Sequence, residues 1–255
     1  MKFRGDHDAT SMFAKGKARM ASERISRDAS VLRASVDRVS EKLGEYKFRK
    51  AKGRSIFVDY IPAAVTKVFT LDEAAIYAGN ARILEDVHLA VLREAKIRVV
   101  GPNGIGKTTL LAAMLRGAHV AAERILYLPQ ELTARDGIAM LDAVRVLNPG
   151  ERGRVLNLVA ALGIDPDRLL ESAAPSPGEA RKLAMAYGLG RQVWAMVLDE
   201  PTNHLDMPAI ERLEEALVEY PGAMVIVTHD DALARKCTNV EWRLNAGRVE
   251  IRSSS

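Results

Sequence analysis

The stretch Gly101-Pro102-Asn103-Gly104-Ile105-Gly106-Lys107-Thr108 decides how the rest of the chain is interpreted. Its glycines, lysine and threonine occupy every fixed position of the phosphate-binding P-loop pattern, Gly-x-x-x-x-Gly-Lys-Ser/Thr. An alternating β pattern precedes the stretch over 95–100, and a helical run follows it over 109–115. Glycines allow consecutive backbone N–H groups to point into one concavity, and the helix that begins there adds the positive end of its dipole. A strand–loop–helix unit that holds phosphate is therefore predicted here, rather than an ordinary glycine-rich turn.

The pattern also assigns individual roles inside the loop. Lys107 is expected to reach the β- and γ-phosphates of a nucleotide, and the hydroxyl of Thr108 is expected to bind Mg²⁺. The other residues predicted to bind the nucleotide are Gly101, Pro102, Asn103, Gly104, Ile105, Gly106 and Thr109.

A nucleotide hydrolase needs polar groups near this loop, and three further segments supply them. Asp199 and Glu200 follow the apolar run 193–198, where the carboxyl end of a strand would hold ligands in an open α/β sheet. Asp199 is predicted to hold Mg²⁺ and Glu200 to act as the general base for the attacking water. His229 ends another apolar run and is predicted to contact the γ-phosphate, and Gln130 is predicted to complete the shell of the ion or hold the water. The structural alternatives are two carboxylates that cap a turn and an ordinary structural histidine.

The order of elements predicts an α/β fold with a mostly parallel core sheet. Apolar runs at 125–128, 193–198 and 223–227 predict buried strands, and 179–189 and 209–218 predict helices. Short β segments before the P-loop predict an antiparallel part, with a turn at 78–81, and a further strand is predicted near 56–60. Helical runs broken by prolines predict a helical insertion at about 136–190. The short β segments are placed at 65–69, 75–77 and 87–91.

Composition limits the class of protein. The chain has 255 residues, is 48% hydrophobic and contains one cysteine, Cys237, so a disulfide within the chain is impossible and a reducing compartment is expected. It contains neither the run of about 20 apolar residues that a membrane span needs nor an apolar signal-peptide core near Met1. A soluble cytoplasmic protein without a membrane span is expected.

The net charge of +4 hides an uneven distribution, because residues 1–54 contain 15 basic and 7 acidic side chains. Apolar residues between Ile25 and Tyr46 alternate at spacings of four and three, as in a coiled coil. Five cations follow within 47–54, a composition that suits phosphate contacts with nucleic acid. A basic helical arm at 1–55 and a cassette domain at 56–252 are predicted; the alternative for the arm is a solvated linker.

The motifs appear in the order of an ATP-binding cassette (ABC) nucleotide-binding domain, which the chain resembles over about 65–255. Gly101–Thr108, Gln130, 176–179, 198–206 and 228–230 resemble its Walker A, Q-loop, signature, Walker B with D-loop, and H-switch. The run Asp-Glu-Pro-Thr-Asn-His-Leu-Asp at 199–206 and the basic arm resemble the ABC-F branch, the soluble ribosome-associated ATPases. The resemblance implies ATP hydrolysis, contact with the ribosome or its RNA, and a role as a translation factor or in ribosome protection against antibiotics.

Two features depart from the family pattern. The signature is usually Leu-Ser-Gly-Gly-Gln/Glu, whereas Pro175 and Pro177 stand here in place of the leucine and the first glycine. Ser176, Gly178 and Glu179 remain as predicted contacts to ATP. The family also has two cassettes in one chain, each completing the ATP site of the other. A second cassette is therefore expected as partner, either another chain or the first half of a longer protein, and the resemblance of the N-terminus to the inter-cassette linker favours the latter.

Two assignments stay open on the sequence alone. Tyr77 lies where the family has an aromatic platform for adenine, and Phe69 is its competitor. The alternatives to a ribosome-associated ATPase are the nucleotide-binding subunit of a membrane transporter and an ATP-gated binding module whose hydrolysis is vestigial.

Overall fold

The computed structural model describes residue 57 and residues 60–253. These residues belong to the second of two compact units of the chain, 48–255. The predicted basic arm at 1–55 lies outside the described residues, so its coiled-coil pattern and its boundary with the cassette stay predictions.

A six-stranded sheet forms the centre of the described unit, in the order β4-β5-β6-β3-β7-β8. Neighbouring strands from β4 to β7 are parallel, and only β8 pairs antiparallel, with β7. The mostly parallel core sheet predicted from the sequence is thus confirmed. The strands are β3 (Lys96–Val100), β4 (Ile125–Leu128), β5 (Ala195–Asp199), β6 (Ala223–Val227), β7 (Val240–Asn245) and β8 (Arg248–Ser253).

A long hairpin precedes the P-loop. Strands β1 (Lys67–Ala78) and β2 (Ala81–Leu92) pair antiparallel, and the turn at 79–80 confirms the predicted turn. The expectation of several short β segments was wrong, because each strand continues through polar positions such as Asp72, which pairs with His88. One side of an antiparallel ladder can face water, so polar residues do not end the strand. The predicted strand near 56–60 is not observed at the two described residues, since Phe57 lies in a turn and Tyr60 in irregular structure.

Four of the described helices, α4 to α7, begin with a proline in the first turn after a capping residue. Asn148 and Asp165 cap helices that have Pro149 and Pro166 in the first turn. Proline is tolerated there because the first N–H groups of a helix have no partner within the helix. Residues predicted as breakers are therefore helix starts. The helices are α2 (Lys107–Arg116), α3 (Ala134–Arg145), α4 (Pro149–Ala161), α5 (Pro166–Glu171), α6 (Pro177–Gly190), α7 (Met207–Glu219) and α8 (Asp231–Cys237), with a 3₁₀ turn η1 (Ala122–Arg124). None of the helices within 60–253 is both long and apolar enough to cross a membrane.

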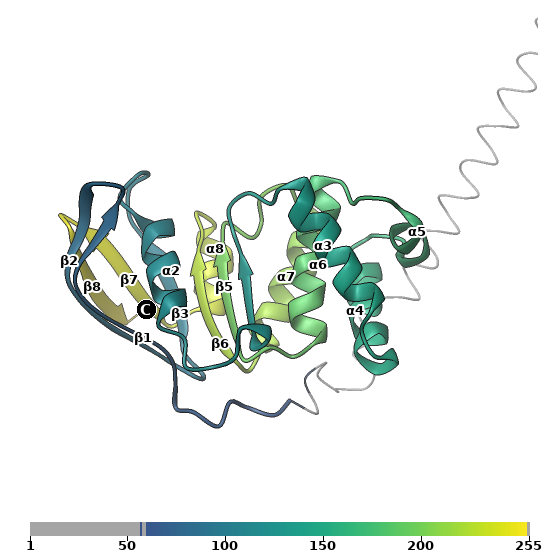
Figure 1. Ribbon diagram of the computed structural model, residues 1–255, viewed down its shortest axis with the longest axis horizontal. Helices are drawn as coiled ribbons and strands as arrows, with labels where there is room; N and C mark the ends of the chain where they lie inside the picture. The colour runs from purple at the N-terminus through teal and green to yellow at the C-terminus, as the bar shows by residue number, and fades with distance from the viewer. Residues whose placement is uncertain (1–56, 58–59, 254–255) are drawn as a thin grey trace, which may run out of the picture. The chain divides into compact units, whose positions relative to one another are not determined.

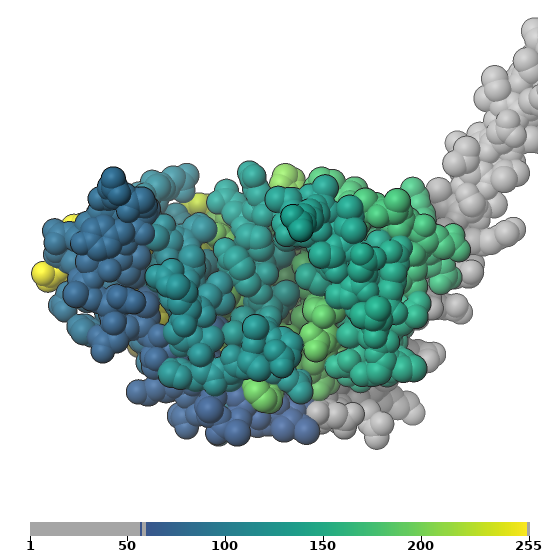
Figure 2. All heavy atoms as spheres, viewed as in Figure 1, coloured from purple at the N-terminus to yellow at the C-terminus, as the bar shows by residue number. Residues whose placement is uncertain are grey.

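The sheet separates two hydrophobic cores. Met196 and Leu198 of β5 pack into the core beneath the helices α3, α4, α6 and α7. Ala195 and Val197 pack into the core formed with α2 and the β1–β2 hairpin. Successive side chains of a strand point to opposite faces, so a strand that is buried on both sides is apolar throughout. Figure 1 shows the helical part and the hairpin at opposite ends of this unit, and the space-filling view in Figure 2 shows the same division by colour.

The topology brings distant loops to one edge of the sheet. Strands β3, β5 and β6 run parallel, with β6 between the other two. The P-loop follows β3, Glu200 follows β5, and His229 comes shortly after β6. The carboxyl ends of these strands therefore present their loops at the same edge, where ligands bind in open α/β sheets.

Candidate functional site

A cavity of about 670 Å³ opens at this edge of the sheet. It is lined by six residues of the segment 103–109 and by Gln130, Asp199, Glu200 and His229. Four motifs that are far apart in the sequence thus lie around one cavity. Of the residues predicted to bind the nucleotide, Gly101, Pro102 and Ile105 belong to the loop but do not line the cavity.

The P-loop has the backbone conformation that its glycines permit. Gly104 and Gly106 have φ angles of +77° and +105°, in a region that L-residues rarely adopt. The ammonium group of Lys107 donates hydrogen bonds to the carbonyl oxygens of Gly101 and Pro102, at 2.9 and 3.1 Å. The lysine thus folds over its own loop, and its charge lies against the backbone that would surround a phosphate.

Two glycine substitutions separate the crowding in this loop from its backbone strain. A Cβ at Gly106 would lie 2.0 Å from Cγ2 of Ile83, whereas a Cβ at Gly104 would meet nothing within 4 Å. Gly104→Ala is expected to cost about 1 kcal/mol from backbone strain, and Gly106→Ala about 1–3 kcal/mol more from overpacking. Urea unfolding of both variants measures the difference, and equal unfolding free energies would contradict the crowding at Gly106.

The beginning of α2 differs from the other helix starts. Helices α3 to α8 each begin with a side chain that accepts a hydrogen bond from the first turn, but α2 begins at Gly106 without such a cap. No acidic residue lies in the first turn of α2. The first N–H groups of a helix need acceptors, and an anion placed there gains from the helix dipole. Within the described α-helices, α2 alone thus has no capping side chain for its N-terminal donors, and residues of this N-terminus line the cavity.

The side chains of Thr108 and Asp199, which both line the cavity, form a hydrogen bond with each other. The hydroxyl of Thr108 donates to Oδ2 of Asp199 at 2.7 Å. A hydroxyl, a carboxylate and the amide of Gln130 are oxygen ligands, which suit Mg²⁺. No group of three or more His, Cys, Asp or Glu side chains suited to a metal occurs within 60–253. Magnesium needs no such group, because it is usually bound by one or two carboxylates together with water and substrate phosphate. These residues therefore fit the ion.

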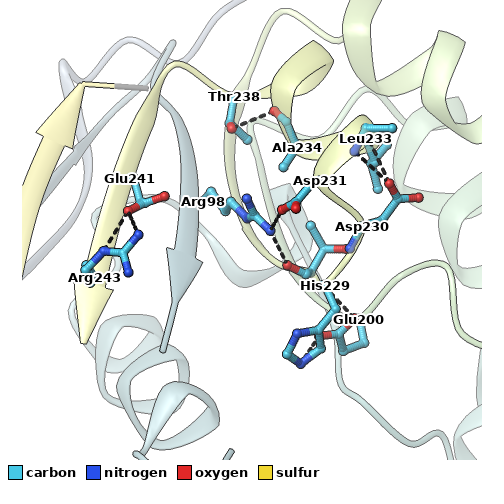
Figure 3. A network of polar contacts seen from close by, with 12 residues as sticks. Arg98, Glu200, His229, Asp230, Asp231, Leu233, Ala234, Thr238, Glu241 and Arg243 are labelled. Atoms are coloured by element: carbon cyan, nitrogen blue, oxygen red, sulfur yellow. Dashed lines mark hydrogen bonds and ion pairs between the residues drawn. The ribbon is translucent and has the colours of Figure 1, made fainter. Parts of the chain in front are cut away.

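Glu200 is buried, and one of its carboxylate oxygens accepts no hydrogen bond within the described residues. The residue is 9% exposed, and Oε1 is buried without a hydrogen-bond donor among the described residues. The imidazole Nε2 of His229 lies 3.4 Å from that oxygen, and the backbone N–H of His229 donates to Oε2 at 3.4 Å. Figure 3 shows the exposed ring of His229 beside the Glu200 side chain. A buried carboxylate oxygen without a donor beside a polar cavity is suited to accept a proton from a bound water.

Arg98 of β3 holds the segment that carries His229. Its guanidinium donates to the carbonyl oxygen of Thr228 at 3.0 Å and to the Asp231 carboxylate at 2.6 Å (Figure 3). The hydrogen bond from Arg98 lowers the pKa of Asp231 below its usual value. The P-loop strand and the His229 segment are thus tied together by a side chain as well as by the ladder between β3 and β6.

The predicted signature residues lie outside the cavity. Ser176 caps α6 by accepting from the N–H of Glu179 at 3.4 Å, and Glu179 accepts from the N–H of Ser176 at 2.8 Å. Hydrogen bonds that the Ser176 side chain and backbone donate to its carboxylate lower the pKa of Glu179. Pro177 occupies the first helical position, where its missing N–H costs the helix nothing. Neither these residues nor Gly178 line the cavity.

The two aromatic residues considered for stacking on adenine differ in how exposed their side chains are. Phe69 is 1% exposed and belongs to the core, whereas Tyr77 is 58% exposed near the end of β1. Tyr77 does not line the cavity. Phe69 is thus a packing residue, and the role of Tyr77 stays a prediction.

Several residues at the site were not predicted. Thr202, Asn203 and Asp230 line the cavity, although they lie inside motifs quoted from the sequence. Arg181 is 2% exposed and donates hydrogen bonds to two loops that border the cavity. The only signal in the sequence was a cation on the helix predicted over 179–189, and this signal does not distinguish a buried side chain from a solvated one.

Comparison with known proteins defines the class of this domain. Residues 84–203 match the family model described as "ABC transporter". Two solved structures share the fold: an ATP-binding subunit of an ABC transporter (TM-score 0.59, 22% identity, 72% of this chain and 89% of that one), and a dimeric post-hydrolysis ATP-binding cassette bound to ADP and phosphate (TM-score 0.58, 20% identity, 72% and 97%). The described domain is an ATP-binding cassette.

The similar curated proteins narrow the family further than the solved structures do. The tylosin resistance ATP-binding protein TlrC of Streptomyces fradiae is 35% identical over 163 residues, which are 60% of this chain and 30% of TlrC. The ribosome protection protein VmlR of Bacillus subtilis is 30% identical over 68% of this chain and 33% of its own length. The Escherichia coli protein Uup is 30% identical over 71% and 31%. These relatives are ABC-F proteins, which confirms the resemblance found in the motifs. The chain spans about a third of the length of these relatives.

Proposed function

We propose that this chain is the ATP-binding and ATP-hydrolysing cassette of an ABC-F-like protein that acts on the ribosome, as a translation factor or in protection against antibiotics. One observation carries the ATPase part of the proposal. The N-terminus of α2, which has no side-chain cap, faces the same cavity as Asp199 and Glu200, and the buried Oε1 of Glu200 accepts no hydrogen bond within the described residues. Donors for phosphate, ligands for a cation and an acceptor for a proton thus surround one space.

The chemistry follows from these groups. The α2 N-terminus and Lys107 bind the β- and γ-phosphates, and Thr108, Asp199 and Gln130 would hold Mg²⁺, which would offset phosphate charge. Glu200 accepts a proton from the attacking water, whose oxygen forms a bond to the γ-phosphorus as the bond to the ADP oxygen breaks. His229, 3.4 Å from Glu200, contacts the γ-phosphate. The products are ADP and inorganic phosphate.

A second cassette completes the site. Ser176, Gly178 and Glu179 lie outside the cavity, so they have no ligand there and are available to the ATP of a partner. The structural neighbour described as a dimer has the same fold. Hydrolysis is therefore expected to depend on pairing, either with another chain or with a first cassette in a longer protein, and Tyr77 would stack on adenine.

The ribosomal part of the proposal rests on the relatives and on charge. VmlR is named as a ribosome protection protein, and TlrC as a tylosin resistance protein. The 15 basic residues within 1–54 supply the cations that a polyanion such as ribosomal RNA attracts. A cassette subunit of a membrane transporter has no use for such an arm.

Salt-dependent cosedimentation with ribosomes tests this proposal. The chain is expected to pellet with ribosomes in ATP and to dissociate as salt rises. A variant with neutral glutamines at five arm positions should bind more weakly. The slope of the logarithm of its binding constant against the logarithm of the salt concentration should fall in magnitude by about 0.7–0.9 for each phosphate that the arm no longer neutralises. The five positions are Lys47, Arg49, Lys50, Lys52 and Arg54.

A matched control replaces five exposed cations of the cassette by glutamine and should keep the parent's salt slope. These positions are Lys67, Arg82, Arg135, Arg248 and Arg252. Absence of cosedimentation at low salt, or equally weakened binding in the two variants, would reject the ribosomal role of the arm.

A further inference from the structure

Arg181 is a buried cation that no motif of the site accounts for. It lies in the second turn of α6, five positions after Ser176, and it is 2% exposed. Burial lowers the pKa of its guanidinium, although the charges of Asp199 and Glu200 act in the opposite direction. Burying a charged side chain costs free energy unless its donors form hydrogen bonds. The partners of Arg181 should therefore show why it is buried.

The partners are backbone carbonyl groups of two loops at the cavity. Nη1 donates to the carbonyl oxygen of Glu200 at 2.8 Å. Nη2 donates to the carbonyl oxygen of Pro129 at 3.1 Å and to that of Gln130. Within the described residues, Arg181 forms no ion pair with a carboxylate side chain. The planar guanidinium therefore joins the loop of Gln130 to the loop of Glu200, and it leaves both carboxylates at the site available.

The loop of Glu200 needs such support. Glu200 has a φ angle of +49°, and residues before a proline, here Pro201, normally adopt extended backbone. A left-handed conformation of a non-glycine residue costs about 1–3 kcal/mol and persists only where the surroundings enforce it. Besides Arg181, the enforcing bonds run from the N–H of Glu200 to Val227 and from the N–H of Asn203 to Glu200, at 2.9 and 3.2 Å.

We propose that Arg181 is a positioning residue that holds the backbone of Glu200 in its strained conformation and fixes the Gln130 loop beside it, so that both side chains are directed into the cavity. Its catalytic consequence rests on the proposed ATPase function. Because α6 begins at the signature residue Ser176, the same helix presents the signature at one end and carries this guanidinium one turn later. A displacement of α6 on pairing would thus move both loops together.

Hydrogen exchange measured by mass spectrometry tests the positioning directly and needs no catalysis. In Arg181→Met, amides in the segments 128–133 and 198–205 should exchange about tenfold faster, because the substitution removes a charge-assisted hydrogen bond to each loop. Amides in the P-loop segment 101–110 should keep their parent rates.

Arg145→Met is the matched control. Arg145 of α3 also donates to two backbone carbonyl oxygens, those of Leu170 and Ser172, at 2.7 and 2.8 Å, but it lies in the helical part away from the cavity. Its replacement should accelerate exchange near 168–173 and leave 198–205 unchanged. Parent-like exchange at both loops in Arg181→Met would overturn the proposal.

Steady-state ATPase measurements distinguish positioning from mere stability. Arg181→Met should lower kcat at least tenfold and leave KM and the affinity for a fluorescent ATP analogue within about threefold, because the hydrogen bonds of Arg181 go to the loops of Gln130 and Glu200 and not to the P-loop. Arg181→Lys keeps the charge but cannot reproduce the planar guanidinium with its several donors. Its kcat should therefore lie between those of the parent and Arg181→Met. Unchanged kcat with altered exchange would refute the catalytic consequence. A parent chain that binds ATP but does not hydrolyse it would instead refute the proposed ATPase function, while the exchange experiment still decides the role of Arg181.

Discussion

Glu200→Gln should lower ATP turnover by about 10²–10⁴-fold and leave ATP binding close to that of the parent. Oε1 of Glu200, which accepts no hydrogen bond within the described residues, is the group assigned to take the proton from water, and general-base catalysis contributes a factor of this size. Glutamine has nearly the same shape and an acceptor oxygen, so the cavity is kept while its basicity is removed. The measurements are phosphate release at saturating ATP and equilibrium binding of a fluorescent ATP analogue.

The same variant should accumulate in the ATP-bound, paired form, because hydrolysis no longer releases the partners. Size-exclusion chromatography in ATP is expected to show a larger fraction of pairs for Glu200→Gln than for the parent. Glu215→Gln, an exposed change on α7, is the control and should match the parent in both measurements. Normal turnover by Glu200→Gln would remove Glu200 from the mechanism.

Lys107→Met should weaken ATP binding by about 100-fold. Lys107 is expected to form charge-assisted hydrogen bonds to two phosphates, each worth about 1.5–3 kcal/mol before the cost of desolvation, and each 1.4 kcal/mol is a factor of ten. Methionine keeps most of the stem, so the weakening reports the charge. Isothermal titration with ATP in the presence of Mg²⁺ measures the effect.

The affinity for adenosine, which has no phosphate, separates the causes. It should be equal in Lys107→Met and the parent, since the phosphates alone contact Lys107. Lys67→Ala removes an exposed lysine at the start of β1 and should bind ATP as the parent does. Parent-like ATP affinity in Lys107→Met would contradict the phosphate contact.

The sequence predicted the parallel core better than its periphery. Strands β5 and β6 are buried on both faces, so their sequences are continuous apolar runs bounded by polar residues. Strands β7 and β8 were not predicted, because continuous apolar runs were the signal used for strands, whereas Glu241 and Arg243 alternate with Trp242 and Leu244 in a strand that is buried on one face only. The long β1–β2 hairpin was divided for the same reason.

The site was predictable where its residues follow strands. The P-loop, Asp199, Glu200, His229 and Gln130 were expected to converge, and they line one cavity, although their chemical roles remain predictions. Arg181 could not be found in this way. Its partners are main-chain oxygens, which carry no sequence signal, and its burial depends on how α6 packs against the two loops.

The strand order also has a consequence for how the protein is made. Strand β3, which leads into the P-loop, pairs only with β6 and β7 within the described part of the chain, and these come from its last third. A nascent polypeptide released or stalled before β6 would present β3 without either neighbour in the sheet. Such long-range pairing is slow and exposes apolar edges to aggregation. The chain should thus become able to bind nucleotide late in biosynthesis, in one step, when β6 and β7 leave the ribosome and pair with β3.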